Sequence, residues 1–103
     1  MIKRAGLPKH VVLAAWGISA GTLERARVAH RRLSSNASGR AMHLELVMQT
    51  ADALFGFRRF TALWMLSSVP ALGNHRPVDF VTTSSGTTAV LDFLGGIEVG
   101  LPA

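Results

Sequence analysis

The side chains that could take part in catalysis gather in one short segment of this 103-residue chain. Threonine and serine hydroxyls crowd residues 82–88, and Asp79 and Asp92 lie on either side of this run. Such runs usually cap helices and form turns, because their side chains bond to nearby backbone groups. The segment contains no nucleophile elbow, phosphate-binding loop or pair of catalytic carboxylates. We therefore predict that the protein is not an enzyme and uses no cofactor.

Residues able to bind a metal are equally sparse. The chain has no cysteine, which excludes thiolate ligands and disulfide bonds. Its histidines form no His-Glu-x-x-His motif and no pair four residues apart; they are His10, His30, His43 and His75. His30 falls on a predicted apolar stripe, so we expect it to pack rather than to bind an ion. The sequence therefore predicts no metal site.

Charge is distributed unevenly along the chain, whose formal net charge is +5. Residues 1–40 hold eight basic side chains and one acidic one, whereas residues 41–103 hold three basic and five acidic ones. A basic front half suits a phosphate backbone, and a slightly acidic back half suits a partner of another kind. A solvated basic surface without a ligand explains the same charges. Charge alone leaves both alternatives open.

The composition is that of a folded domain. Hydrophobic residues make up 49% of the chain, enough for a buried core at this length. No apolar stretch approaches the ~18 residues that a membrane-spanning helix needs. Lys9 and His10 interrupt any signal-peptide core, and the lack of cysteine fits a reducing compartment. We therefore expect a cytoplasmic protein with no membrane contact and no small-molecule substrate.

The sequence pattern around the candidate residues is mostly that of helices. It predicts helices over residues 9–16, 20–33, 40–55, 58–66 and 87–98, with a short helical turn that begins at Pro77. The third helix has the most regular apolar stripe, which consists of Leu44, Val47, Met48, Ala51, Leu54 and Phe55. In the fourth helix, Phe60, Leu63 and Trp64 are expected to face inward. No strand pattern extends beyond a few residues, so the predicted fold class is all-α.

The first two predicted helices, between Pro8 and Leu33, resemble a helix-turn-helix. Gly17 suits the left-handed conformation that ends the first helix, and Ser19 suits the cap of the second. In such pairs the second helix enters the major groove of DNA. The residues predicted to contact DNA are Ser19, Ala20, Thr22, Arg25, Arg27, Arg31 and Arg32. The alternative is a helical hairpin whose arginines are only solvated.

The end of the chain is unusually apolar for a terminus. Ile97, Val99 and Leu101 follow the pair Gly95-Gly96, in which each glycine weakens a helix by about 1 kcal/mol relative to alanine. Such a tail could insert into the pocket of a partner protein. It could equally fold back on the protein's own core or on a homodimer partner. The residues alone leave these alternatives open.

Six segments in the right order and spacing share the pattern of one protein family. They are residues 17–25, residues 33–40, Ala53-Leu54-Phe55-Gly56, Ala62-Leu63-Trp64-Met65, the loop Ala71-Leu72-Gly73 with Arg76-Pro77-Val78, and the series Gly86, Val90, Leu94, Ile97 and Gly100. Together they resemble the Xre/MbcA/ParS antitoxins, the partners of RES-domain toxins. The resemblance covers most of the chain.

This resemblance implies a type II antitoxin with two parts. Residues 1–35 would be a basic, DNA-binding segment, and residues 36–103 a helical toxin-binding domain. The family's toxins consume NAD or use it to modify a target, and the C-terminal tail would occlude the toxin's active site. Leu72, Gly73 and Pro77 would hold that surface in place. The residues implied for toxin contact are Leu94, Ile97, Glu98, Val99, Gly100, Leu101, Pro102 and Ala103.

The resemblance also implies further partners. The family often represses its own operon through the N-terminal helices, usually as an oligomer with toxin. Operator DNA and a second copy of this chain within the complex are therefore expected. The alternative, from another functional class, is a small helix-turn-helix transcriptional regulator whose C-terminal domain only dimerises.

Overall fold

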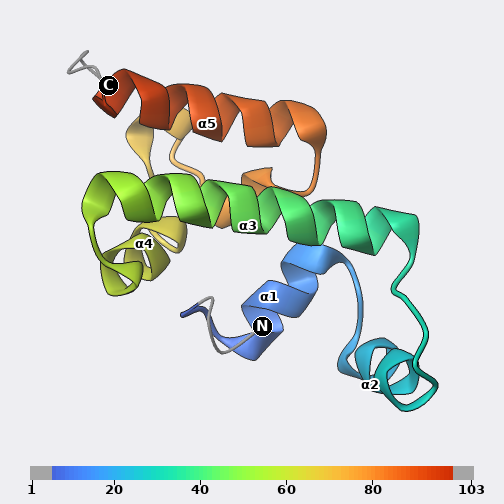
Figure 1. Cartoon of the computed structure of the whole chain (residues 1–103). Helices are drawn as coiled ribbons and strands as arrows, with labels where there is room; N and C mark the ends of the chain where they lie inside the picture. Colours follow the sequence, from blue (N-terminus) through green and yellow to red (C-terminus); the bar gives the residue numbers. More distant parts are fainter. Residues whose placement is uncertain (1–5, 99–103) are drawn as a thin grey trace.

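The structure, a computed structural model, describes residues 6–98 of the chain. Helices make up almost all of its regular structure (Figure 1). They are α1 (Lys9–Trp16), α2 (Ala20–Val28), α3 (Ser35–Phe55), α4 (Arg58–Met65), η2 (Pro70–Leu72), η3 (Pro77–Phe80) and α5 (Ser84–Glu98), where η marks a 3-10 helix. Within residues 6–98 the β pairing is limited to an isolated bridge between Val69 and His75. The all-α prediction is confirmed.

The long helix α3 is the centre of the arrangement. Helix α5 packs along one side of α3, and α1 and α4 pack along the other side (Figure 1). Helix α2 lies apart from these four, beyond the N-terminal half of α3 (Figure 1). The structure therefore presents α2 and α5 at different places on the molecule.

The core is built on the predicted apolar stripe of α3. Leu44, Val47, Met48 and Ala51 are buried, and Leu54 and Phe55 pack against the same cluster. Side chains of α1, α4 and α5 complete this cluster; they include Val12, Trp16, Met65, Val90 and Leu94. Full burial of one such side chain stabilises the fold by about 1.5–3 kcal/mol. Helix α1 shares its hydrophobic core with α3. The predicted boundary at residue 35 therefore separates two proposed functions and not two separate cores.

The junction between α2 and α3 differs from the prediction. Helix α2 ends at Val28 instead of residue 33, and His30 follows with a φ of 53°, a left-handed conformation that stops a helix. Helix α3 begins at Ser35 instead of residue 40, because the Ser34 hydroxyl caps it by accepting the N–H of Ala37 at 3.1 Å. His30, predicted to pack on an apolar stripe, is therefore exposed on a turn.

The inward face of α4 also differs from the prediction. Phe60 and Leu63, expected inside, are 54% and 59% exposed, whereas Thr61, Ala62 and Met65 are buried. The cause is Arg58 at the start of the helix, whose Nε lies 2.7 Å from Oδ2 of Asp52 in α3. This ion pair turns the face of Arg58 toward α3, and residues three, four and seven positions later follow it inward.

The start of α5 depends on Thr83, which belongs to the hydroxyl-rich run at residues 82–88. The Thr83 hydroxyl accepts the N–H of Gly86 at 3.0 Å, and the helix begins three residues earlier than predicted. A side chain at Gly86 would collide with the carbonyl oxygen of Phe80. Glycine at this position therefore lets the first turn of α5 pack directly on the end of η3.

Candidate functional site

Helix α5, which the resemblance places at the toxin, is held firmly on the body. Val90 and Leu94 are 0% and 1% exposed and lie in the core. The ring of Phe93 stacks on Trp64 of α4, with centroids 6.2 Å apart and an angle of 4° between the planes. Trp64 in turn meets Phe55 of α3 edge-on at 5.5 Å. These contacts fix the C-terminal half of α5 against both α3 and α4.

The outward side of α5 carries small side chains. Ser85, Thr88, Ala89 and Asp92 are exposed along it. Near its end, a Cβ atom on Gly95 or Gly96 would meet no atom of residues 6–98 within 4 Å outside the adjoining backbone of the helix itself. The last turns of α5 therefore leave room for another protein to approach the helix backbone closely.

The structure describes only the first part of the predicted toxin contacts. Leu94 lies in the core, where its side chain holds α5 in place, and Ile97 is half-buried. Glu98 is the last residue of α5. The remaining predicted contacts lie outside the described residues; they are Val99, Gly100, Leu101, Pro102 and Ala103.

The loop expected to hold this surface contacts the body closely. Leu72 and Pro77 are buried, and Gly73 takes a φ of 71° to close the turn. The N–H of Val69 donates to the carbonyl of His75 at 3.1 Å across the base of the loop. Helix η3, which follows, packs against α5. Helix η3 thus forms part of the support for α5, and Leu72 of the loop lies in the same hydrophobic core.

One ion pair fastens η3 at its start. Arg76 donates from Nη2 to Oδ1 of Asp79 at 3.0 Å and from Nε to Oδ2 at 3.1 Å. Hydrogen bonding to this carboxylate, together with its charge, raises the pKa of Arg76 above the ordinary arginine value. Asp79, which borders the hydroxyl-rich run in the sequence, is thereby engaged in holding a turn.

Three predicted DNA contacts meet at the N-terminus of α2. The Ser19 hydroxyl caps the helix by accepting the N–H of Thr22 at 3.1 Å, and the two side-chain oxygens lie 3.0 Å apart. Arg25 donates from Nη2 to the Thr22 hydroxyl at 3.3 Å. Ala20 is exposed beside them. The Ser19 and Thr22 hydroxyls and the Arg25 guanidinium are therefore linked by hydrogen bonds at the N-terminus of α2, the end of a helix that favours an anion.

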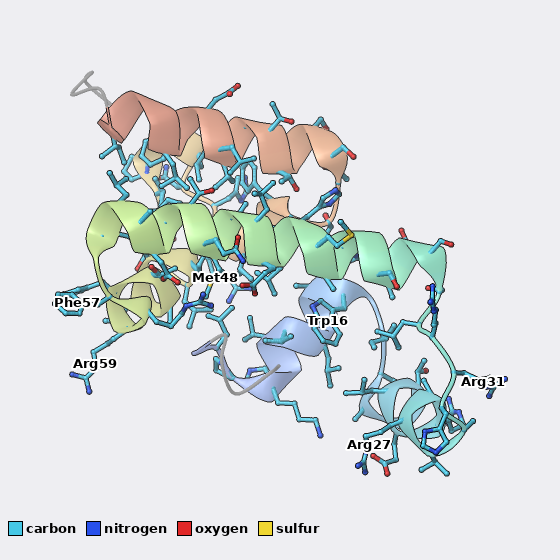
Figure 2. All side chains as sticks on the ribbon, in the orientation of Figure 1. Trp16, Arg27, Arg31, Met48, Phe57 and Arg59 are labelled. Atoms are coloured by element: carbon cyan, nitrogen blue, oxygen red, sulfur yellow. The ribbon has the colours of Figure 1, made fainter. Side chains whose placement is uncertain are left out.

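The three other arginines predicted to contact DNA differ in whether an acidic side chain pairs with them. Arg27 pairs with Glu24, its Nη2 lying 2.7 Å from Oε1, and both side chains are exposed. The hydrogen bond from Arg27 and its charge lower the pKa of Glu24. Arg31 and Arg32 are exposed and take part in none of the ion pairs found within residues 6–98. Arg27 and Arg31 both project away from the helical body (Figure 2).

Helix α2 packs only loosely against the rest of the protein. None of its residues is buried. Ile18, Leu23 and Leu33, in and around it, are partly buried and pack against the core. The basic surface of α2 is consequently displayed to solvent rather than folded into the body.

The hydroxyl-rich run has a structural part in this fold. The Thr83 hydroxyl caps α5, and the buried Thr87 donates its own hydroxyl to the carbonyl of Thr83 at 2.8 Å. Across residues 6–98, no three His, Asp or Glu side chains come together as metal ligands. No helix in the described part of the chain has the length and apolar character needed to cross a membrane.

Sequence reasoning missed an exposed apolar patch formed by Phe57, Phe60 and Leu63. These side chains are 63%, 54% and 59% exposed, and the two phenyl rings lie 5.7 Å apart. The signal that reveals the patch is Arg58, whose pairing with Asp52 determines which side of α4 faces α3. Hydrophobic periodicity alone does not contain this information.

Comparisons with known proteins point to one family. Residues 50–100 match the family described as "Antitoxin Xre/MbcA/ParS C-terminal toxin-binding domain". Over 98 residues the chain is 33% identical to a curated protein named "Antitoxin Xre" from Yersinia enterocolitica serotype O:8 / biotype 1B (strain NCTC 13174 / 8081). This alignment includes 94% of the present chain and 66% of the relative, so the chain spans just under two thirds of that protein's length.

Proposed function

Because this chain belongs to the Xre/MbcA/ParS antitoxin family, we propose that it is a type II antitoxin that neutralises a RES-domain toxin by binding it. In this proposal the last turns of α5 and the tail after it dock at the entrance of the toxin's NAD site. The antitoxin performs no chemistry. It excludes NAD from the pocket by occupying the entrance.

The placement of α5 is the observation that carries this proposal. Its inner side is fixed by Val90, Leu94 and the Phe93–Trp64 stack. Its outer side bears small residues and ends in two glycines with open space around them. Because these contacts hold α5 in place, the helix loses little conformational freedom on docking, which favours tight binding.

The chemistry of the tail suits the proposed pocket. A site that binds NAD must hold a pyrophosphate, and such sites use positive charge and backbone N–H groups. Glu98 supplies a carboxylate at the end of α5, followed by the apolar residues Val99 and Leu101. We propose Glu98, Gly100 and Leu101 as direct contacts, with the carboxylate placed where the toxin accepts a phosphate.

The direct experiment is to measure how fast the purified toxin consumes NAD in the presence of this protein. The full chain is expected to abolish consumption at a stoichiometric ratio, and a chain that lacks residues 99–103 is expected to leave it unchanged. Arg25→Ala, which alters the other end of the molecule, is the control and should inhibit fully. Inhibition by the shortened chain would overturn occlusion by the tail.

We also propose that the N-terminal helices bind the operator DNA of the protein's own operon. The supporting observation is the hydrogen-bonded series Ser19–Thr22–Arg25 at the exposed start of α2. Arg31 and Arg32 would contact the phosphate backbone, which adds affinity but no sequence preference. Arg27 is expected to contribute less, because Glu24 already balances its charge.

Operator binding can be tested separately from toxin binding. Arg25→Ala is expected to weaken binding to DNA from the promoter of the operon, by about 1–3 kcal/mol if the guanidinium contacts a base. Arg59→Ala, on α4, is the matched control and should bind as the parent protein does (Figure 2). Equal affinity of the parent protein and Arg25→Ala would contradict a role of this arginine in DNA binding.

The competing function is a small transcriptional regulator whose C-terminal domain only dimerises. An affinity pull-down from the native cells, followed by mass spectrometry, separates the two. Recovery of a stoichiometric RES-type protein supports the antitoxin, whereas recovery of this chain with DNA alone supports the regulator. We further propose that two copies of the chain associate within the toxin complex, which the mass of that complex by light scattering tests.

A further inference from the structure

Arg40 lies in the family-like segment 33–40, yet neither proposed surface includes it. Its side chain leaves α3 and ends at the C-terminus of α1. Nε donates to the carbonyl oxygen of Ala15 at 2.7 Å, and Nη2 donates to that of Ala14 at 3.3 Å. One arginine thus connects α3 to the point where α1 turns into α2.

The end of α1 explains why an arginine is held there. Gly17 closes the helix by donating its N–H to Ala14 at 3.1 Å, and Ile18 donates to Leu13 at 3.1 Å. These two bonds leave the carbonyl of Ala15 for another donor, and Arg40 supplies it. Helix α1 has no basic residue in its own last turn. Arg40 therefore also supplies the positive charge that a helix C-terminus favours.

Gly17 is fitted to this contact as well as to the turn. Its φ of 77° is the left-handed conformation that ends α1. A Cβ at this position would also collide with the guanidinium of Arg40, lying 2.9 Å from its central carbon. The absence of a side chain therefore brings the arginine close to the backbone of the turn.

The direction of α2 depends on this turn. The helix has no buried residue of its own, and three residues, 17–19, separate it from α1. At its other end, residues 29–34 lead to α3, the helix that also carries Arg40. Arg40 consequently connects the start of α2 to α3, the same helix to which the end of α2 leads.

We propose that Arg40 is a positioning residue that fixes the direction of α2 and so determines how Ser19, Thr22 and Arg25 meet DNA. The inference rests on the proposed binding of operator DNA. Loss of Arg40 frees α2 to take several orientations. The exposed arginines still meet phosphates in most of these orientations. Ser19, Thr22 and Arg25, however, no longer enter the DNA groove in a single orientation.

The test compares Arg40→Met, Arg40→Lys and the control Arg59→Met. Each is measured for affinity to a duplex from the promoter of the protein's own operon, for affinity to an unrelated duplex of equal length, and for inhibition of the toxin. Hydrogen exchange of the free proteins is recorded for each helix. The lysine variant keeps the charge and one donor but not the two-carbonyl contact.

For Arg40→Met we expect promoter affinity to fall about tenfold or more, the loss typical of a charge-assisted hydrogen bond, while affinity for the unrelated duplex changes little. Amide exchange should accelerate in α2 and stay unchanged in α3 and α5. Toxin inhibition should be intact, and Arg40→Lys should recover part of the promoter affinity. Arg59→Met should match the parent protein throughout.

Two results would overturn the inference, and a third would overturn only the DNA proposal on which it rests. Equal losses on both duplexes with unchanged exchange in α2 would make Arg40 an ordinary phosphate contact. Faster exchange in every helix, with weaker toxin inhibition, would make it a general contributor to stability. If the parent protein bound neither duplex, the DNA proposal itself would fail, and exchange in α2 would still show whether Arg40 fixes that helix.

Discussion

The indole of Trp64 and the phenyl ring of Phe93 lie parallel, with centroids 6.2 Å apart, and this stack joins α4 to the C-terminal half of α5. Phe55, the last residue of α3, meets the same indole edge-on, with the two ring centroids 5.5 Å apart. Three helices therefore share one aromatic cluster directly beneath the segment proposed to bind toxin. Aromatic pairs of this kind contribute about 0.5–1.5 kcal/mol beyond the area that they bury.

Phe93→Ala should consequently weaken both the fold and toxin binding. We expect a loss of about 2–4 kcal/mol in the free energy of unfolding, somewhat below a fully buried phenylalanine because Phe93 is only half-buried. Calorimetry of the toxin complex at a temperature where the variant is fully folded should still show a lower affinity. Undiminished affinity in the folded variant would mean that the stack does not orient α5 for the toxin.

Truncation should cost much more stability on the buried side of α4 than on its exposed side. Met65→Ala removes a fully buried side chain and should cost about 2–5 kcal/mol, whereas Phe60→Ala removes an exposed ring and should stay within about 0.5 kcal/mol. Urea unfolding of both variants measures the difference. A cost for Phe60→Ala as large as that for Met65→Ala would place the phenyl ring inside the core.

Two glycine substitutions should change stability in opposite directions. Gly86→Ala brings a methyl group onto the carbonyl of Phe80, so η3 or α5 must shift, at a cost of about 1–3 kcal/mol. Gly39→Ala, inside α3 with nothing within 4 Å of the new atom, should stabilise by up to about 1 kcal/mol. Thermal unfolding by circular dichroism compares them. A stable Gly86→Ala protein would contradict the close contact between α5 and η3.

The ion pair on α2 should be visible in a pH titration. Hydrogen bonding to Arg27, then the charge of Arg27, lowers the pKa of Glu24, and Lys9 adds a smaller attraction. Because the folded pKa lies below the ordinary glutamate value, the pair's contribution to stability is complete above that value and is lost as pH falls through the lowered pKa. Carboxyl NMR should therefore show Glu24 titrating below an ordinary glutamate.

Arg27→Gln should move that midpoint upward, toward the ordinary value. Arg31→Gln, which removes another exposed arginine of the same region, is the control and should leave the Glu24 midpoint in place. A Glu24 that titrates identically in the parent protein and in Arg27→Gln would show that the pair does not form in solution.

Much of the fold could be read from the sequence where periodicity and capping agree. The stripe of α3 from Leu44 to Phe55, the left-handed Gly17 and the Ser19 cap all appear as predicted. These features depend on residues close together in the chain. Local preferences therefore determine them without knowledge of the tertiary structure.

The errors arise where a contact or a turn outweighs the local pattern. The Arg58–Asp52 ion pair orients α4 so that Phe60 and Leu63 face solvent. The left-handed His30 ends α2 before its apolar stripe is complete. Likewise, the bond from Arg40 to Ala15 joins residues 25 positions apart, a separation that no local pattern reports. The tail beyond Glu98, central to the proposed function, stands out in the sequence by its apolar residues, but only the family resemblance indicates what it binds.

The central claim is that the end of this chain blocks a toxin's NAD site. Its most direct test is the rate at which the purified RES-domain toxin consumes NAD, measured against increasing amounts of the full chain and of the chain without residues 99–103. The account predicts complete inhibition at a stoichiometric ratio by the full chain and none by the shortened one. Equal inhibition by both, or no inhibition by either, would contradict it.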